Sequence, residues 1–121
     1  MPRVLVIDDE ELRRKAIRVV LEIDGYEVID AADGAVGLRL YREHGADLVL
    51  VDMFMPEKDG LEVIRALRTE VPRPIMIAMS GGGQSGQADP LEAAKALGAA
   101  RTIVKPFQPR ELLTMIRELL P

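Results

Sequence analysis

The stretch Asp47–Gly60, which reads DLVLVDMFMPEKDG, decides how the rest of the chain is interpreted. Leu48–Val51 is an unbroken apolar run, which is typical of a strand buried on both faces of a parallel sheet. The run stops at Asp52, and Pro56 is well placed to start a helix over about residues 57–70. Asp52 is therefore predicted at the carboxyl edge of an open α/β sheet, where ligands bind in such folds. Taken alone, it would be interpreted as a turn residue.

Working outward, similar apolar runs alternate with helical patterns along the whole chain. The predicted strands cover residues 4–7, 27–30, 48–51, 75–79 and 102–104, and the predicted helices cover about 12–23, 34–44, 57–70, 90–97 and a C-terminal stretch around 112–120. This alternation calls for a parallel sheet covered by helices on both faces. Right-handed crossovers leave few topologies. We predict one α/β domain over residues 1–121, a (βα)5 flavodoxin-like doubly wound sheet with strand order 2-1-3-4-5.

The first predicted helix has an apolar set at helical spacing, with most charged residues on the other side. The apolar set is Leu12, Ala16, Val19, Val20 and Ile23, and the charged set is Arg13, Arg14, Lys15, Arg18 and Glu22. The apolar set is expected to face the core. Arg13, Arg14 and Arg18 are expected either to meet an acidic partner surface or to form a solvated face.

Composition excludes several classes of function. The chain has 121 residues, a formal net charge of −4 and no long basic run, so we expect no direct nucleic-acid partner. The absence of cysteine excludes thiolate metal sites and thiol catalysis. The N-terminal apolar run is too short for a signal peptide or a membrane span, so a cytoplasmic location and no membrane contact are expected.

Four of the predicted strands end in polar side chains that carry chemistry. These are the pair Asp8 and Asp9, then Asp52, Ser80 and Lys105. Individually, each has an ordinary explanation as a helix cap, a turn former or a solvated strand end. Because the carboxyl ends of parallel strands meet at one edge of the sheet, we expect the four positions to form a shared site.

The residue types at this expected site favour phosphoryl transfer. Carboxylates close together repel each other, and a hard divalent cation with oxygen preference relieves this, with Mg²⁺ fitting best. A carboxylate can itself accept a phosphoryl group. Lys105 and Ser80 can then neutralise or hydrogen-bond the transferred oxygens. On these grounds Asp52 is the predicted acceptor, and Asp8 and Asp9 are the predicted metal pair.

Together, Asp8-Asp9, Asp52 followed by MPEKDG, Ser80, and Lys105-Pro106-Phe107 resemble the receiver domain of two-component response regulators, of the single-domain chemotaxis type. The resemblance covers essentially the whole chain. It implies transfer from the phosphohistidine of a sensor histidine kinase or phosphotransfer protein to Asp52, and a downstream protein target. It also implies Mg²⁺ held by Asp8, Asp9, Asp52 and the backbone carbonyl of Phe54, and a cis bond between Lys105 and Pro106.

The chain departs from the family pattern in the segment through which receivers usually signal. The family usually has an aromatic residue three positions before the lysine, and here that position is Thr102. The stretch from Ser80 to Gly98 is also a few residues longer than usual. Ser80 and Thr102 are therefore the candidate switch residues, and residues 81–87 are predicted to become ordered when Asp52 is phosphorylated.

Other functions remain open from the sequence. A phosphate-independent receiver-like scaffold keeps the fold without the switch. A Mg²⁺-dependent phosphatase with an aspartyl nucleophile usually has Asp-x-Asp after its first strand, whereas this pair is adjacent. A flavodoxin-like cofactor binder lacks aromatic residues placed for a flavin. The chain is expected to be either a stand-alone receiver or the front of a longer regulator, with or without a dimer that forms on phosphorylation.

Overall fold

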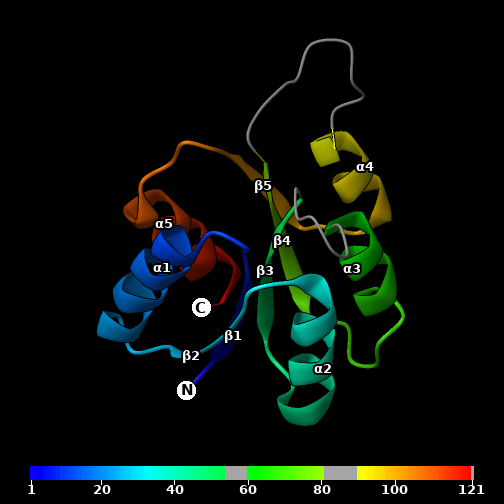
Figure 1. The fold of residues 1–121 in the computed structure, drawn as a ribbon, viewed down its shortest axis with the longest axis horizontal. Helices are drawn as coiled ribbons and strands as arrows, with labels where there is room; N and C mark the ends of the chain where they lie inside the picture. Colours follow the sequence, from blue (N-terminus) through cyan, green and yellow to red (C-terminus); the bar gives the residue numbers. More distant parts are fainter. Residues whose placement is uncertain (54–59, 81–89, 121) are drawn as a thin grey trace.

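Five parallel strands form a single sheet in the computed structural model, which describes residues 1–53, 60–80 and 90–120 (Figure 1). The strands are β1 (Arg3–Ile7), β2 (Glu27–Ala31), β3 (Leu48–Asp52), β4 (Ile75–Ser80) and β5 (Arg101–Val104). Their order is β2-β1-β3-β4-β5, and every neighbouring pair is parallel. The predicted fold and strand order are confirmed.

Helices cover both faces of this sheet. They are α1 (Glu11–Ile23), α2 (Gly34–His44), α3 (Gly60–Leu67), α4 (Pro90–Leu97) and α5 (Pro109–Leu119). Figure 1 shows α1 and α5 on one face and α2, α3 and α4 on the other. The third helix was predicted to reach Glu70 but ends at Leu67, where a tight turn follows and Glu70 N–H donates to the Leu67 carbonyl at 3.0 Å. The predicted start of that helix at Glu57 lies outside the described residues.

The core has two layers, one on each side of the sheet. Along β3, successive side chains point to opposite faces, as the pleat of a strand requires. Leu48 and Leu50 pack in the layer under α1 and α5, whereas Val49 and Val51 pack in the layer under α2, α3 and α4. All four are completely buried. β3 therefore has no solvent face, and its end is a rigid base for the residue that follows Val51.

The predicted core face of α1 is largely wrong, because of its five residues only Val20 packs against the core. The buried residues of α1 are Ile17 and Leu21, whereas Leu12, Val19 and Ile23 are 77%, 53% and 81% exposed. Both sets recur at helical spacing, so the sequence offers two apolar stripes on one helix. Packing against the sheet and α5 uses the stripe with Ile17 and Leu21, and the other remains on the surface as an exposed apolar stripe.

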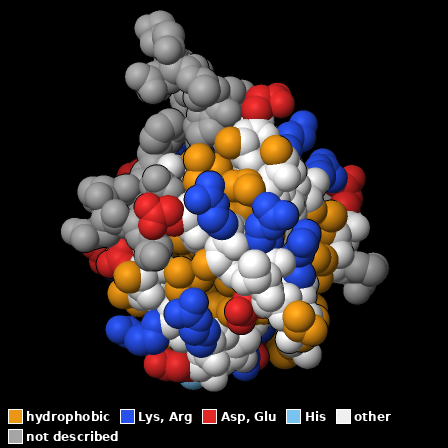
Figure 2. All heavy atoms as spheres, turned by 90° about the vertical axis from the view of Figure 1, so that its right-hand side faces the viewer, with side chains coloured by type: hydrophobic (Ala, Val, Ile, Leu, Met, Phe, Trp, Pro, Cys, Tyr) orange, Lys and Arg blue, Asp and Glu red, His pale blue; other side chains and the backbone are white. Residues whose placement is uncertain are grey.

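The outer face formed by α2, α3 and α4 is polar and of mixed charge. Figure 2 shows Lys and Arg side chains on this face interspersed with apolar and acidic ones. Within the described residues, no helix is long and apolar enough to cross a membrane.

Candidate functional site

The predicted site residues meet at the carboxyl edge of the sheet. Ile7 pairs with Val51 in the β1–β3 ladder, so Asp8 and Asp52 leave adjacent strands at the same level. Ser80 ends β4, and the Lys105 N–H just after β5 donates to the Ser80 carbonyl at 2.6 Å. Among the residues that the structure describes, the buried polar side chains are Asp8, Asp52 and Ser80, all completely buried. The buried polarity of the described protein is thus concentrated at this edge.

Three carboxylates form a compact acidic cluster there. Ligand oxygens of Asp8, Asp9 and Asp52 lie within 4.8 Å of one another, with Asp8 and Asp52 buried and Asp9 exposed. Burying carboxylates is costly unless cations or hydrogen bonds compensate the charge. A set of oxygen donors suits a hard cation, and the exposed Asp9 keeps one side open to solvent. The cluster can therefore hold a metal ion. Phe54, the predicted source of a backbone carbonyl ligand, lies outside the described residues.

Among the residues that the structure describes, Lys105 is the cation nearest to the predicted acceptor. Its Nζ donates to Asp52 Oδ1 at 2.8 Å, and the side chains are 14% and 1% exposed. A charge-assisted hydrogen bond of this length between poorly hydrated groups is among the stronger polar contacts in proteins. The Lys105–Pro106 peptide bond is cis, as the family resemblance implied.

Arg13 is a site residue that the sequence reasoning missed. Its Nε and Nη2 donate to Asp8 Oδ2 and Oδ1 at 2.6 and 2.9 Å, and Nη2 lies 3.6 Å from Asp52 Oδ2. The hydrogen bond to Asp8 raises the pKa of the Arg13 guanidinium. Arg13 was assigned to the polar side of α1. Because Ile17 and Leu21 set the buried face, the first turn presents Arg13 to Asp8 instead.

The other two arginines predicted to be free for a partner or for solvent are also engaged within the chain. Arg14 Nη1 donates to the Asp8 carbonyl at 2.9 Å, and its Nε lies 3.5 Å from Asp30 Oδ2. Arg18 lies 3.2 Å from Glu22 and 3.4 Å from Asp30. These side chains hold α1 against the strand ends. Because the arginines are already paired within the chain, the exposed apolar stripe is the better candidate for a contact surface.

Gly60, the first residue of α3, packs directly against the backbone of Asp52 and Met53 and so helps to fix the position of Asp52. A Cβ at Gly60 would lie 2.5 Å from the Asp52 carbonyl oxygen and 2.7 Å from the Met53 Cα. Real Cβ atoms essentially never approach so closely, so only glycine allows α3 to begin against the backbone that follows β3. The Met53 N–H also donates to the Met79 carbonyl at 2.8 Å, which ties this turn to β4.

The two candidate switch residues lie at different depths. Ser80 is buried at the sheet edge, next to the site. Thr102 in β5 pairs with Ala78 in β4, two residues before Ser80, and is half-buried, so it lies back from the edge. Residues 81–87, whose ordering was predicted, lie outside the described residues, and that prediction stays open.

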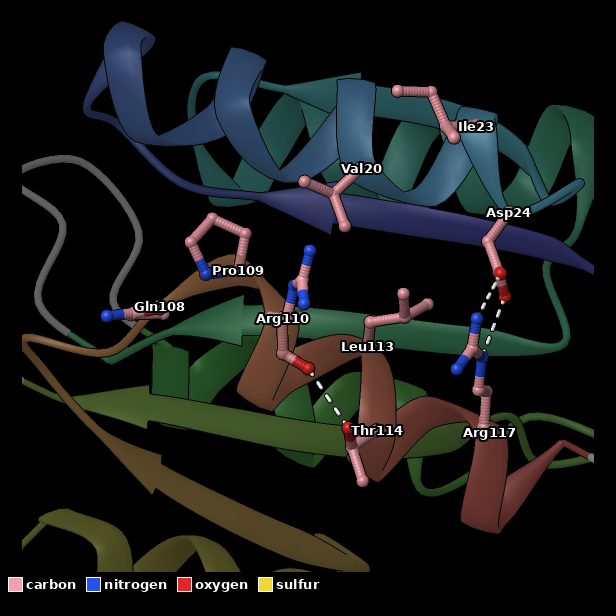
Figure 3. Close-up of a pocket in the computed structure, with 9 residues that line it drawn as sticks. All are labelled: Val20, Ile23, Asp24, Gln108, Pro109, Arg110, Leu113, Thr114 and Arg117. Carbon is pink, nitrogen blue, oxygen red and sulfur yellow. Dashed lines mark hydrogen bonds and ion pairs between the residues drawn. The ribbon is translucent and has the colours of Figure 1, made fainter.

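Of the surface grooves in the described part of the chain, two lie near α1. One adjoins the site and is lined by Glu10, Leu12, Arg13, Lys105, Pro106 and Phe107. The other lies between α1 and α5 and has apolar walls of Val20, Ile23 and Leu113 (Figure 3). In this second groove Arg117 and Asp24 form an ion pair that joins the end of α1 to α5. Leu12 and Ile23 thus connect the exposed apolar stripe to both grooves.

Comparison with known proteins agrees with this geometry. The family model described as "Response regulator receiver domain" matches residues 4–117. A probable transcriptional regulator, ycf27, of Porphyridium aerugineum is 41% identical over 118 residues, which are 98% of this chain and 48% of that protein. The transcriptional regulatory protein ResD of Bacillus subtilis is 35% identical over the same shares. The chain spans about half the length of these curated relatives.

Solved structures extend the likeness to three dimensions. The chemotaxis response regulator CheY4 of Vibrio cholerae is 30% identical, with a TM-score of 0.88 over 99% of each chain. A receiver domain protein from Methanospirillum hungatei, described as CheY-like, is 29% identical with a TM-score of 0.90. Because the family model matches nearly the whole chain and these relatives share at least 29% identity with it, the chain belongs to the response regulator receiver domains of two-component signalling.

Proposed function

We propose that Asp52 is the phosphoacceptor of this receiver, with a phosphohistidine as the donor. In the transfer, a carboxylate oxygen of Asp52 attacks the phosphorus, the P–N bond breaks, and its electron pair returns to the donor imidazole. The observation that supports this most directly is the buried Asp52 carboxylate, 2.8 Å from the Lys105 ammonium and beside Asp8 and Asp9. Asp8 would be a poorer acceptor, because Arg13 donates to both of its carboxylate oxygens, and Asp9 is exposed.

Asp8, Asp9 and Asp52 would hold the cation, with Phe54 adding its carbonyl in our proposal, and Mg²⁺ is the ion that best fits oxygen ligands and retained waters. When bound, the ion neutralises negative charge on the phosphoryl oxygens. Lys105, just after β5, would supply a positive charge, and Ser80 at the end of β4 would supply a hydroxyl that donates to a further oxygen. The chain thereby assists its own phosphorylation and its later hydrolysis.

The phosphoryl group adds about −1.5 to −2 charges and three acceptor oxygens at a buried position. We propose that Ser80 and Lys105 follow these oxygens and shift the population of states at the ends of β4 and β5. Residues around Thr102 would carry this change to a downstream protein target, with dimer formation as one form of output. In this scheme residues 1–121 act as one signalling domain in the cytoplasm.

The decisive experiment is intact-mass analysis after incubation with Mg²⁺ and a small acyl phosphate. Wild type is expected to gain the mass of one phosphoryl group, whereas Asp52→Asn and a chelator-treated sample are expected to gain none. A gain that persists in Asp52→Asn would exclude Asp52 as the acceptor. Absence of any gain in wild type, with phosphohistidine donors also inactive, would favour the phosphate-independent scaffold.

We further propose that the donor protein docks on the exposed apolar stripe of α1. Leu12 lines the groove beside Lys105, so a protein seated on Leu12, Val19 and Ile23 would bring its histidine to the mouth of the site. Leu12→Glu and Ile23→Glu are expected to slow transfer from a phosphorylated phosphotransfer domain at least about tenfold, because they place charge in an apolar contact. Phosphorylation by a small acyl phosphate should be unchanged.

Val71→Glu is the matched control for the docking proposal, since Val71 is 96% exposed and lies outside α1. It is expected to leave both reactions unchanged. If Leu12→Glu and Ile23→Glu accept the phosphoryl group from the protein donor at the wild-type rate, the donor docks elsewhere.

A further inference from the structure

Asp8 already has a cation in the described protein. Arg13 donates to both oxygens of the Asp8 carboxylate, at 2.6 and 2.9 Å, and the same guanidinium lies 3.6 Å from Asp52. A two-pronged contact of this kind matches the planar guanidinium to the carboxylate and adds geometric specificity to the charge attraction. One side chain therefore compensates two buried carboxylates of the acidic cluster.

This contact and a divalent cation compete for the same oxygens. Asp8 Oδ1 also accepts from the Glu10 N–H at 2.9 Å, so three hydrogen bonds are committed to this one carboxylate. A cation bound to Asp8 and Asp52 would lie within a few ångströms of the guanidinium, and like charges repel strongly where solvent screening is weak. We therefore expect metal binding to weaken the contact of the Arg13 guanidinium with Asp8.

The surroundings provide a place for the displaced guanidinium. Arg13 Nη1 also donates to Glu10 Oε2 at 2.6 Å, and the Glu10 side chain is 54% exposed. Both residues line the groove that opens beside Lys105 and Phe107. The contact with Glu10 and the adjoining groove therefore offer Arg13 an alternative position in which it keeps an ionic partner after leaving Asp8.

We propose that Arg13 is a built-in counter-cation of the acidic cluster, which holds Asp8 and Asp52 in the metal-free protein and weakens divalent-metal binding by competing for Asp8. Arg13 thereby sets the metal concentration at which Asp52 can be phosphorylated. The inference rests on the proposed function of the cluster. Arg13 acts as a positioning residue, since it acts on the carboxylates rather than on the transferred group.

The test measures metal binding directly with Mn²⁺, an oxygen-preferring ion whose free concentration is followed by electron paramagnetic resonance. Arg13→Met removes the charge and is expected to bind Mn²⁺ about tenfold more tightly, the effect expected for losing a competing charged hydrogen-bond partner. Arg13→Lys keeps a charge without the fork and is expected to lie between Arg13→Met and wild type.

Arg18→Met is the matched control, because Arg18 also pairs with α1 and β2 carboxylates but lies away from the cluster. It is expected to leave Mn²⁺ affinity unchanged.

Urea unfolding is the second readout. Without metal, Arg13→Met is expected to unfold at lower urea than wild type, and saturating Mg²⁺ is expected to stabilise it more than wild type, because tighter binding to the native state adds stability.

The inference is overturned if Arg13→Met and Arg13→Lys bind Mn²⁺ no more tightly than wild type does. Circular dichroism must show that both variants are folded. If wild type still takes up one phosphoryl group at Asp52 in that case, the proposed function stands and only the role of Arg13 falls. If wild type neither binds Mn²⁺ nor accepts a phosphoryl group, both proposals fail together.

Discussion

Replacing Gly60 with alanine tests whether the start of α3 sets the position of the acceptor. The added Cβ would lie 2.5 Å from the Asp52 carbonyl oxygen, and ordinary van der Waals contact begins at 3.4 Å. The backbone at Asp52 or the start of α3 must therefore move by about 0.9 Å. The two nearest atoms, the Asp52 carbonyl oxygen and the Met53 Cα, both belong to the backbone, so the backbone has to take up the displacement.

Two effects of Gly60→Ala can be estimated. Overpacking of this kind costs about 1–3 kcal/mol, and alanine returns part of that through its better helix propensity, so we expect a net loss of about 1–2 kcal/mol in the free energy of unfolding. A misplacement of about 1 Å at a reacting group can cost about a hundredfold in rate. We therefore expect phosphorylation by an acyl phosphate to slow by about ten- to a hundredfold.

Gly37→Ala is the matched control. A Cβ at Gly37 would meet Cδ1 of the Ile7 side chain, and Cγ1 at 2.7 Å, and no backbone atom is among these contacts. Because the clash is with a buried side chain and not with the backbone of Asp52, a comparable loss of stability but a wild-type rate is expected. Urea unfolding measures the stability of each variant, and time-resolved intact mass measures its phosphorylation rate. Wild-type stability together with a wild-type rate in Gly60→Ala would refute the reasoning.

Three further predictions concern other parts of the molecule. Lys105→Gln is expected to slow acyl-phosphate phosphorylation about a hundredfold, the typical effect of removing one charge-stabilising donor; a wild-type rate by intact mass would exclude its role. Arg117 hydrogen-bonds Asp24 and lowers the pKa of that carboxyl, so the pair stabilises the fold above about pH 4 and loses this effect as pH falls further. Arg117→Gln should accordingly be less stable than wild type at pH 7, and the difference should shrink at pH 3; urea midpoints that differ equally at both pH values would contradict this. Ile64→Ala, at a completely buried position in α3, is expected to lower the free energy of unfolding by about 2–5 kcal/mol, and a loss below 1 kcal/mol would mean that the cavity collapses.

The strands and the main site residues could be predicted from the sequence because each depends on local pattern. Leu48–Val51 is apolar throughout because β3 is buried on both faces, and that requirement is visible in four consecutive residues. Asp8, Asp52, Ser80 and Lys105 interrupt or end such runs, and parallel strands bring their carboxyl ends to one edge whatever the details of packing.

The placement of side chains on α1 could not be predicted in the same way. Leu12, Val19 and Ile23 follow the helical period as well as Ile17 and Leu21 do, so periodicity does not determine which stripe is buried. The rotation of α1 about its axis is decided by its fit against the sheet and against α5, and α5 is distant in sequence. That rotation leaves one apolar stripe exposed and turns Arg13 toward Asp8.

The sequence by itself thus determined the fold and the acidic site with its lysine, because strand burial and strand ends are encoded in short runs of residues. Only the tertiary structure decided that Arg13 compensates Asp8 and that Gly60 supports Asp52. Both contacts join a strand end to the first turn of a helix, and their distances depend on how each helix is seated on the sheet.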